Sequence, residues 1–246
     1  MIKTIFWDND GVLVDTERLY FRATQHVLAT IGIPLTKEQY IDLFLVQGKG
    51  AWHLAADKGV SPSAIAQLRH ARNTLYNMLL SQEPLLIAGV REVLDALYGT
   101  YVMGIVTSSE PDPFALIHQR TGLLPYFRFV LTASDYTHKK PHPEPYLLAV
   151  ERSGCRQEEC LVIEDSERGL TAAKAAGLRC IVVPSEFTRG SNFVGAYKVL
   201  ENLPELLGEL SSQCVAPPNK ALQPTASSLV SLRGDVGASP SRSPGT

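Results

Sequence analysis

Hydrophobic and polar positions along the chain follow two patterns, and the first of them is helical. Residues 16 to about 82 repeat apolar side chains at helical spacing and lack the Val- and Ile-rich alternation that is typical of strands. Capping residues mark three helix starts in this region: Thr16 before Glu17, Thr36 paired with Gln39, and Ser61 before Pro62. The pattern predicts a bundle of helices inserted after a short first strand that ends at Trp7.

The second pattern begins near Pro84, where short apolar stretches alternate with helical ones. We predict strands over 101–106, 127–133, 161–163 and 180–183, and helices over 90–98, 111–120, 143–152 and 166–176. Such alternation is typical of a doubly wound, mostly parallel sheet. The predicted fold class is therefore α/β, with a core domain made of residues 1–15 and 84–210 and an inserted helical cap domain over 16–83.

The character of the chain changes again past Leu210. No aromatic residue follows Tyr197, and prolines stand among serines, glycines and alanines. A segment of this composition has little apolar surface with which to offset the entropy lost on ordering. We expect residues 211–246 to be a disordered tail with no part in catalysis.

Composition and charge exclude several classes of protein. The chain is 45% hydrophobic and 20% charged, as ordinary globular proteins are, and its formal net charge of -2 gives no electrostatic reason to expect nucleic acid as a partner. Its apolar runs are too short to cross a bilayer. The four cysteines and six histidines are dispersed, so neither a zinc site nor a disulfide framework is indicated. We therefore expect a cytoplasmic protein with no membrane or nucleic-acid partner, and interpret His138 and His142 as solvated loop residues.

Acidic and hydroxyl side chains follow several predicted strands at the point where each strand ends. They are Asp8 and Asp10, Thr107 and Ser108, Asp135, and Glu164 with Asp165. The carboxyl ends of parallel strands lie along one edge of a sheet, so we expect these groups to converge there. The inserted helices leave and return at the same edge.

Together these residue types suit phosphoryl transfer. A carboxylate such as Asp8 can act as a nucleophile or, with Asp165, bind Mg²⁺, and a second acid can exchange a proton. Thr107 and Ser108 can donate hydrogen bonds to a phosphate, and Lys140 can supply a cation. Each motif alone also has a structural interpretation: an Asx turn for 8–11, a helix cap for 107–108, a surface lysine, and an acidic pair at a helix start.

The stretch Asp8-Asn9-Asp10-Gly11-Val12-Leu13-Val14-Asp15-Thr16 resembles the opening motif of the haloacid dehalogenase superfamily. Residues 104–107, 140–143 and 162–166 resemble the second, third and fourth motifs, so that the resemblance covers residues 2 to 185. It implies that Asp8 attacks phosphorus and that Asp10 is the acid/base. It also implies a Mg²⁺ ion bound by Asp8, by the backbone carbonyl of Asp10 and by Asp165, with Glu164 orienting water beside it.

The resemblance leaves four functions open, of which three are enzymatic and one is non-catalytic binding. The first is a phosphatase of a small phosphorylated metabolite, with the cap as a lid and Gln47, Lys49 and Trp52 touching the substrate. Alternatively, Gln47 and Lys49 belong to a solvated turn and Trp52 is a core residue. The second is a mutase resembling β-phosphoglucomutase, which has a histidine where this chain has Tyr20. Asp10 argues against the third, a dehalogenase, and no residue favours a non-catalytic binding module. The sequence leaves the oligomeric state open.

Overall fold

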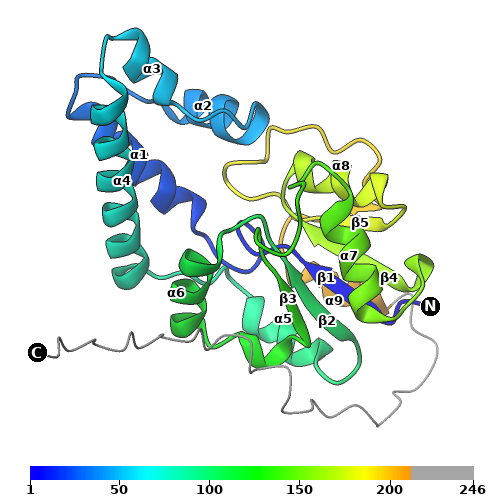
Figure 1. Ribbon diagram of the computed structural model, residues 1–246. Helices are drawn as coiled ribbons and strands as arrows, with labels where there is room; N and C mark the ends of the chain where they lie inside the picture. The colour runs from blue at the N-terminus through cyan, green and yellow to red at the C-terminus, as the bar shows by residue number, and fades with distance from the viewer. Residues whose placement is uncertain (212–246) are drawn as a thin grey trace, which may run out of the picture.

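The computed structural model describes residues 1–211, which are built around one parallel sheet with the strand order β3-β2-β1-β4-β5-β6 (Figure 1). The strands are β1 (Thr4–Trp7), β2 (Val102–Val106), β3 (Phe129–Leu131), β4 (Cys160–Glu164), β5 (Arg179–Val182) and β6 (Lys198–Val199). Each neighbouring pair runs parallel. The predicted doubly wound α/β fold is confirmed.

Alternate residues of the central strand face two different layers of helices. Ile5 and Trp7 pack into an apolar cluster with α5 (Val90–Leu97), α6 (Pro111–Thr121) and α9 (Glu205–Ser211). Phe6 points to the opposite face, which is covered by α7 (Glu144–Ser153) and α8 (Glu167–Ala175). A strand buried on both faces is apolar along almost its whole length, which explains why β1 reads as a short continuous apolar run.

Between β1 and α5 the chain forms a helical insert, which stands beyond the carboxyl ends of the strands (Figure 1). It consists of α1 (Glu17–Ala29), α2 (Lys37–Tyr40), the π-helix η1 (Ile41–Val46), α3 (Trp52–Asp57) and α4 (Pro62–Gln82). The insert has an apolar cluster of its own around Tyr40 and Trp52. Its two connections to the sheet run side by side, because Val14 bridges Leu86.

Two of the three predicted helix caps are confirmed. The Thr36 hydroxyl accepts from the Gln39 N–H at 3.2 Å and Gln39 Oε1 accepts from the Thr36 N–H at 3.0 Å, while Ser61 accepts from the Ala64 N–H. The cap predicted at Thr16 is wrong. Its hydroxyl donates to the Asp10 carboxylate, so it is not available to the first turn of α1.

Several short elements had no sequence signal strong enough to predict them. They are α3, η1, β6, α9 and the 3₁₀-helices η2 (Leu124–Tyr126) and η3 (Gln157–Glu159). Ser211 is the last residue of α9, and residues 212–246, which make up the rest of the predicted tail, lie outside the described residues. Within residues 1–211, no helix combines the length and the apolar character needed to span a bilayer.

Candidate active site

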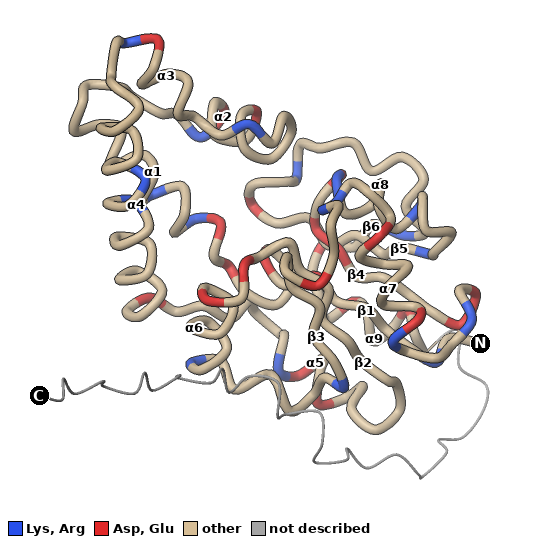
Figure 2. Tube along the Cα trace, viewed as in Figure 1, with Lys and Arg blue, Asp and Glu red and all other residues tan. Residues whose placement is uncertain are grey.

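Lys140 is the centre of a buried cluster of charges at the carboxyl ends of β1 and β4. Its Nζ lies 2.7 Å from Asp8 Oδ1 and 2.7 Å from Glu164 Oε1, and donates to the Val106 carbonyl at 2.8 Å. The parallel pairing of β1 with both β2 and β4 brings these strand ends together. Acidic segments gather on this side of the sheet, facing the insert (Figure 2). Lys140 is therefore a buried partner of two acids, rather than a surface lysine.

The surroundings of Lys140 keep it charged. Burial opposes the charge, but the carboxylates of Asp8 and Glu164 outweigh that effect and raise the pKa of Lys140 above its ordinary value. Tyr146 completes the arrangement, because its hydroxyl donates to Glu164 Oε1 at 2.7 Å and its ring lies 4.8 Å from Lys140 Nζ. Glu164 thus holds the lysine, and it also accepts from the N–H and hydroxyl of Ser166.

Carboxylate oxygens of Asp8, Glu164 and Asp165 lie within 4.8 Å of one another. Burial, followed by the charge of Glu164, raises the pKa of Asp8 to about 8 and raises that of Asp165 as well. If all three carboxyl groups are ionised, the one ammonium of Lys140 leaves two negative charges uncompensated. A hard divalent cation such as Mg²⁺ fits both this deficit and the all-oxygen donors. Asp8 and Asp165 are the residues that would hold it, because both oxygens of Glu164 already accept hydrogen bonds, Oε1 from Lys140 and Tyr146 and Oε2 from Ser166.

Asp10 has hydroxyl and amide partners, in contrast to Asp8. Its Oδ2 accepts from Ser109 Oγ at 2.6 Å, from Thr107 Oγ1 at 3.3 Å and from Asn9 Nδ2 at 3.2 Å, and its Oδ1 accepts from the Thr16 hydroxyl. No lysine or arginine within residues 1–211 forms an ion pair with it. The two acids two residues apart thus have different surroundings, and different surroundings let two carboxyl groups take different chemical roles.

The sequence analysis did not select Ser109 or Thr16 as site residues. It named Ser108, which is half-buried beside Thr107. Thr107 does not cap a helix, since Glu110 is the residue before α6; its hydroxyl instead accepts from the Ser109 N–H and donates to Asp10. The run of hydroxyls from 107 to 109 was the available signal for Ser109.

Asp135 does not join the site. Its Oδ2 accepts from the N–H and the hydroxyl of Thr132 at 2.8 Å and 3.0 Å, and the residue is exposed. The convergence predicted for this strand end is therefore wrong. The reason is that β3 ends early, at Leu131, and Asp135 closes a turn beyond it.

The absence of a side chain at Gly11 leaves room for the Asp165 carboxyl group, and replacing this glycine is expected to disrupt the site. Its φ is +88°, and a Cβ there would lie 2.1 Å from Asp165 Oδ2. We expect Gly11→Ala to lower the free energy of unfolding by about 3 kcal/mol or more, through backbone strain and overpacking together. Gly99 is the matched control, since its φ is +78° with no atom within 4 Å of the added Cβ. Gly99→Ala should cost only the strain, about 1–2 kcal/mol. If urea unfolding gives the two variants the same loss of free energy of unfolding, the steric role of Gly11 is contradicted.

A buried histidine supports the loop between the two acids. His118 Nε2 lies 2.9 Å from Asn9 Oδ1, and Nδ1 lies 3.0 Å from the Thr121 hydroxyl. Because an amide oxygen accepts, Nε2 donates, and in a neutral ring Nδ1 then accepts from the Thr121 hydroxyl. Burial lowers the pKa of His118 to about 4. The side chain that orients Asn9 is thus uncharged at neutral pH.

Acid is expected to destabilise the fold through His118. Between pH 6.5 and about 4 the unfolded chain binds a proton on this residue that the folded protein does not, so stability falls as the pH falls through that window. The full effect is up to about 3 kcal/mol. Urea unfolding at pH 7 and pH 4.5 should show a smaller difference for His118→Gln than for the wild type. His70→Gln, at an exposed position, should leave the difference unchanged.

Tyr76 of the insert lies close to Asp10, and Tyr20 and then Arg72 pack behind it. Burial and then the charge of Asp10 raise the pKa of Tyr76, and the rings of Tyr76 and Tyr20 have centroids 5.1 Å apart. Arg72 Cζ lies 4.2 Å from the Tyr20 ring centroid. Arg72 is only 7% exposed and its Nη1 has no hydrogen-bond partner. Arg72 is thus linked to Asp10 through the rings of Tyr20 and Tyr76, and it keeps one nitrogen without a hydrogen-bond partner.

The three insert residues named from the sequence lie in different surroundings. Gln47 is exposed, and its Nε2 donates to Asp42 Oδ2 at 2.7 Å; Lys49 is exposed on the same turn. Trp52 is 9% exposed and belongs to the apolar cluster of the insert. The turn itself reaches α8, because a Cβ on Gly48 would lie 3.7 Å from the Arg168 guanidinium. This arrangement agrees with a solvated turn and a core tryptophan.

One loop after β5 contacts both the insert and the acid cluster. Phe187 packs into the apolar cluster of the insert, with its ring centroid 5.9 Å from that of Phe21. The neighbouring Thr188 donates to Asp165 Oδ2 at 3.3 Å. Lys37 of the insert also pairs with Glu186 at 2.5 Å. The loop was not identified from the sequence, where it has no motif.

Comparison with known proteins agrees with this geometry. Residues 5–183 match the family model for haloacid dehalogenase-like hydrolases. The chain is 32% identical to the protein CbbY of Cereibacter sphaeroides over 88% of this chain and 99% of that protein. It is 31% identical to the fructose-1-phosphate phosphatase YqaB of Escherichia coli, over 73% of this chain and 95% of the relative.

Two further relatives extend this picture. Identity to the β-phosphoglucomutase of Bacillus subtilis is 26%, over 85% of this chain and 93% of the enzyme. The crystal structure of CbbY from Rhodobacter sphaeroides in complex with phosphate superposes with a TM-score of 0.69. That alignment has 28% identity and covers 84% of this chain and 96% of the other. Both phosphatases and a mutase are thus similar to this chain.

Proposed function

This chain belongs to the haloacid dehalogenase-like hydrolase family and is a phosphate-ester hydrolase, and from that premise we propose that it is a Mg²⁺-dependent phosphatase of a small phosphorylated metabolite such as a sugar phosphate. The observation that supports this most directly is the buried bridge from Lys140 to Asp8 and Glu164, next to Asp165. It combines a carboxylate that can attack phosphorus with a fixed cation.

In the proposed reaction, an oxygen of Asp8 attacks phosphorus and the bond between phosphorus and the ester oxygen breaks. Asp10 gives its proton to the leaving alcohol, so the products of this half are an aspartyl-phosphate and a free hydroxyl. Asp10 then takes a proton from the water that attacks the aspartyl-phosphate, which releases inorganic phosphate and restores Asp8. Asp10 occupies a setting of hydroxyl donors that holds its carboxyl in one orientation throughout.

The remaining residues of the cluster bind and orient. Lys140 and the hydroxyls of Thr107 and Ser108 would carry the charge of the transferred phosphate, and Glu164 and Tyr146 would keep Lys140 in position. Mg²⁺ would be held by Asp8, Asp165 and the backbone carbonyl of Asp10, and when bound it supplies charge neutralisation at the phosphate. The helical insert would act as the cap that excludes water and selects the substrate.

Phosphate release tests the function. Purified protein is incubated with a panel of sugar phosphates, phosphoglycolate and nucleotides, with Mg²⁺ or with a chelator. We expect inorganic phosphate from at least one small phosphate ester, and no release without the metal. Absence of release across the panel in the presence of Mg²⁺ would overturn the proposal.

A phosphomutase is the second candidate, because one relative carries that name. At Tyr20 this chain has a phenol packed edge-on against Tyr76 and Phe44, where the mutase has a histidine. We therefore expect β-glucose 1-phosphate to yield free phosphate if it reacts. Conversion to glucose 6-phosphate would favour the mutase instead.

Arg72 is expected to bind the part of the substrate that is not transferred. Its guanidinium is buried and incompletely paired, so it can offer a charged hydrogen bond to a polar group of the substrate. Loss of such a bond costs about 1.5–3 kcal/mol, so Arg72→Gln should raise KM for the best sugar phosphate by about 10- to 100-fold. Its kcat for p-nitrophenyl phosphate, which lacks that polar part, should change little.

Arg69 is the matched control, because its guanidinium lies over the same Trp52 ring at 5.5 Å but the residue is exposed. Arg69→Gln should leave KM unchanged. Equal increases of KM in the two variants would show that Arg72 has no special part in binding the substrate.

A further inference from the structure

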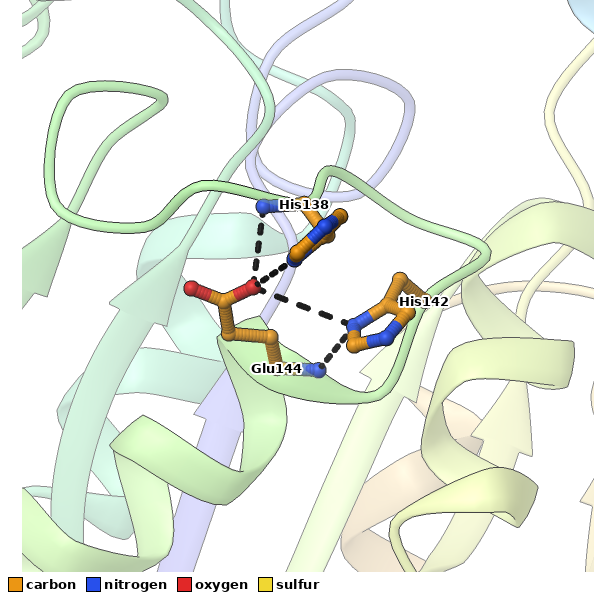
Figure 3. A group of neighbouring side chains, drawn as sticks. All are labelled: His138, His142 and Glu144. Atoms are coloured by element: carbon orange, nitrogen blue, oxygen red, sulfur yellow. Dashed lines mark hydrogen bonds and ion pairs between the residues drawn. The ribbon is translucent and has the colours of Figure 1, made fainter.

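Two histidines and a glutamate form a second cluster, outside the site described above. His138 Nδ1 lies 2.6 Å from Glu144 Oε2 and His142 Nδ1 lies 3.9 Å from the same oxygen (Figure 3). The two imidazole rings have centroids 4.5 Å apart, and one ligand atom from each of the three residues lies within 4.8 Å of the others. We propose that His138, His142 and Glu144 bind a transition-metal ion, Zn²⁺ above all.

The donor set decides the class of ion. Two imidazole nitrogens and one carboxylate oxygen suit Zn²⁺ and its neighbours in the first transition row, whereas Mg²⁺ prefers oxygen donors alone. Three protein ligands leave a position for water, as exposed or open zinc sites have. The cluster is therefore chemically distinct from the all-oxygen group of Asp8, Glu164 and Asp165.

The glutamate is already held in place for such an ion. Its Oε1 accepts from the Thr137 N–H at 2.8 Å, and its Oε2 accepts from the His138 N–H at 2.9 Å. Glu144 is also the first residue of α7, which fixes its backbone. Outer hydrogen bonds of this kind orient a metal ligand before the ion arrives.

The hydrogen bonds of His142 favour a metal over a simple ion pair. Its Nδ1 accepts from the Glu144 N–H at 3.2 Å, so it has a lone pair and no proton there, and an ion that binds this nitrogen would replace that long hydrogen bond. A zinc ion needs such a lone pair. The His138 and His142 side chains are 61% and 50% exposed, so the ion can arrive from solvent without opening the fold.

The position of the cluster predicts what the ion would do. His138 and His142 stand on either side of Lys139 and Lys140, and a shared ion would tie that loop to the start of α7. Lys140 is already seated on Asp8 and Glu164 while the three ligands are together. We therefore expect zinc to stabilise the loop with Lys140 in place, and to leave phosphate release in Mg²⁺ unchanged.

Zinc titration by calorimetry, with Mg²⁺ in excess to fill the all-oxygen site, tests the proposal on the full chain. We expect the wild type to bind one equivalent of Zn²⁺ and to melt at a higher temperature with it. The double variant His138→Ala/His142→Ala and the single variant Glu144→Gln should each bind at least about tenfold more weakly, since loss of even an outer partner typically costs that much. Without zinc, the melting temperature of the double variant should match the wild type, and Glu144→Gln, which weakens two hydrogen bonds to backbone N–H groups, is judged by the shift that zinc causes.

The control is His26→Ala/His53→Ala, which removes two exposed histidines of the insert and should leave zinc affinity unchanged. No zinc binding by the wild type, or equal binding by all variants, would overturn the proposal. The result is independent of the proposed phosphatase activity, because binding and melting are measured without a substrate.

Discussion

Asp8→Asn is expected to reduce phosphate release by at least about 10³-fold, since removing a nucleophile eliminates the route through the covalent intermediate. The amide keeps the size of the side chain, and Lys140 still has Glu164 as a partner. The variant also removes the charge of one of three clustered buried carboxyl groups, two of which pair with Lys140. We therefore expect its free energy of unfolding to stay the same or rise at pH 8, so that loss of activity cannot be attributed to unfolding.

Asp15→Asn is the control for this experiment. Asp15 belongs to the same motif, but its side chain is 44% exposed and pairs with Arg18 on the surface. The same chemical change there should leave kcat within a factor of about two, because exposed ion pairs contribute little. Steady-state phosphate release by the three proteins gives the comparison. Activity of Asp8→Asn close to that of the wild type would end the proposed mechanism.

Lys140→Met is expected to abolish activity and also to weaken the fold. The lysine side chain is 6% exposed and is the shared cation of Asp8 and Glu164, whose side chains are 12% and 0% exposed. Removing one partner of a buried ion pair leaves uncompensated charge, at a cost of about 3–5 kcal/mol. The loss should be smaller at pH 5 than at pH 8, because burial raises the pKa of Asp8 to about 8 and the acid can be protonated in the folded state.

Lys139→Met separates this effect from loss of a positive charge in general. Lys139 pairs with Glu110 at 2.7 Å, but the two side chains are 47% and 61% exposed. We expect a change in stability of less than about 1 kcal/mol and unchanged activity. The two variants are compared by urea unfolding at both pH values and by phosphate release. Equal destabilisation at positions 139 and 140 would mean that the buried bridge does not hold the site together.

Much of the fold could be predicted from local patterns. The apolar runs of β2, β4 and β5 and the helical spacing of α4 and α8 each depend on neighbours within a few residues, and such signals survive without knowledge of the rest of the chain. The elements that were missed are short or depend on distant contacts. The two exposed residues of β6, for example, form a strand only because β5 is beside them.

The residues of the candidate site likewise fall into those that the sequence indicated and those that only the structure identified. Asp8, Thr107, Lys140 and Asp165 were selected because each follows a strand or stands in a motif, and the structure brings them to one edge of the sheet. Arg72 and Thr188 had no such signal, and Ser109 had only the run of hydroxyls from 107 to 109, although each contacts a site residue or its neighbour in space. Their positions follow from the packing of the insert and of the loop after β5.

Sequence alone determined the α/β class, the order of the longer helices and of the strands β1 to β5, and the acids that follow β1 and β4, because hydrophobic spacing and motif order are properties of neighbouring residues. Tertiary structure decided which groups become partners. Lys140 and Asp8 are far apart along the chain, as are Thr188 and Asp165, and the grouping of His138 and His142 with Glu144 depends on the fold of one loop. Contacts between such residues form only when the sheet, the insert and the loops pack together. Burial then sets the charges and the chemistry of the groups that meet.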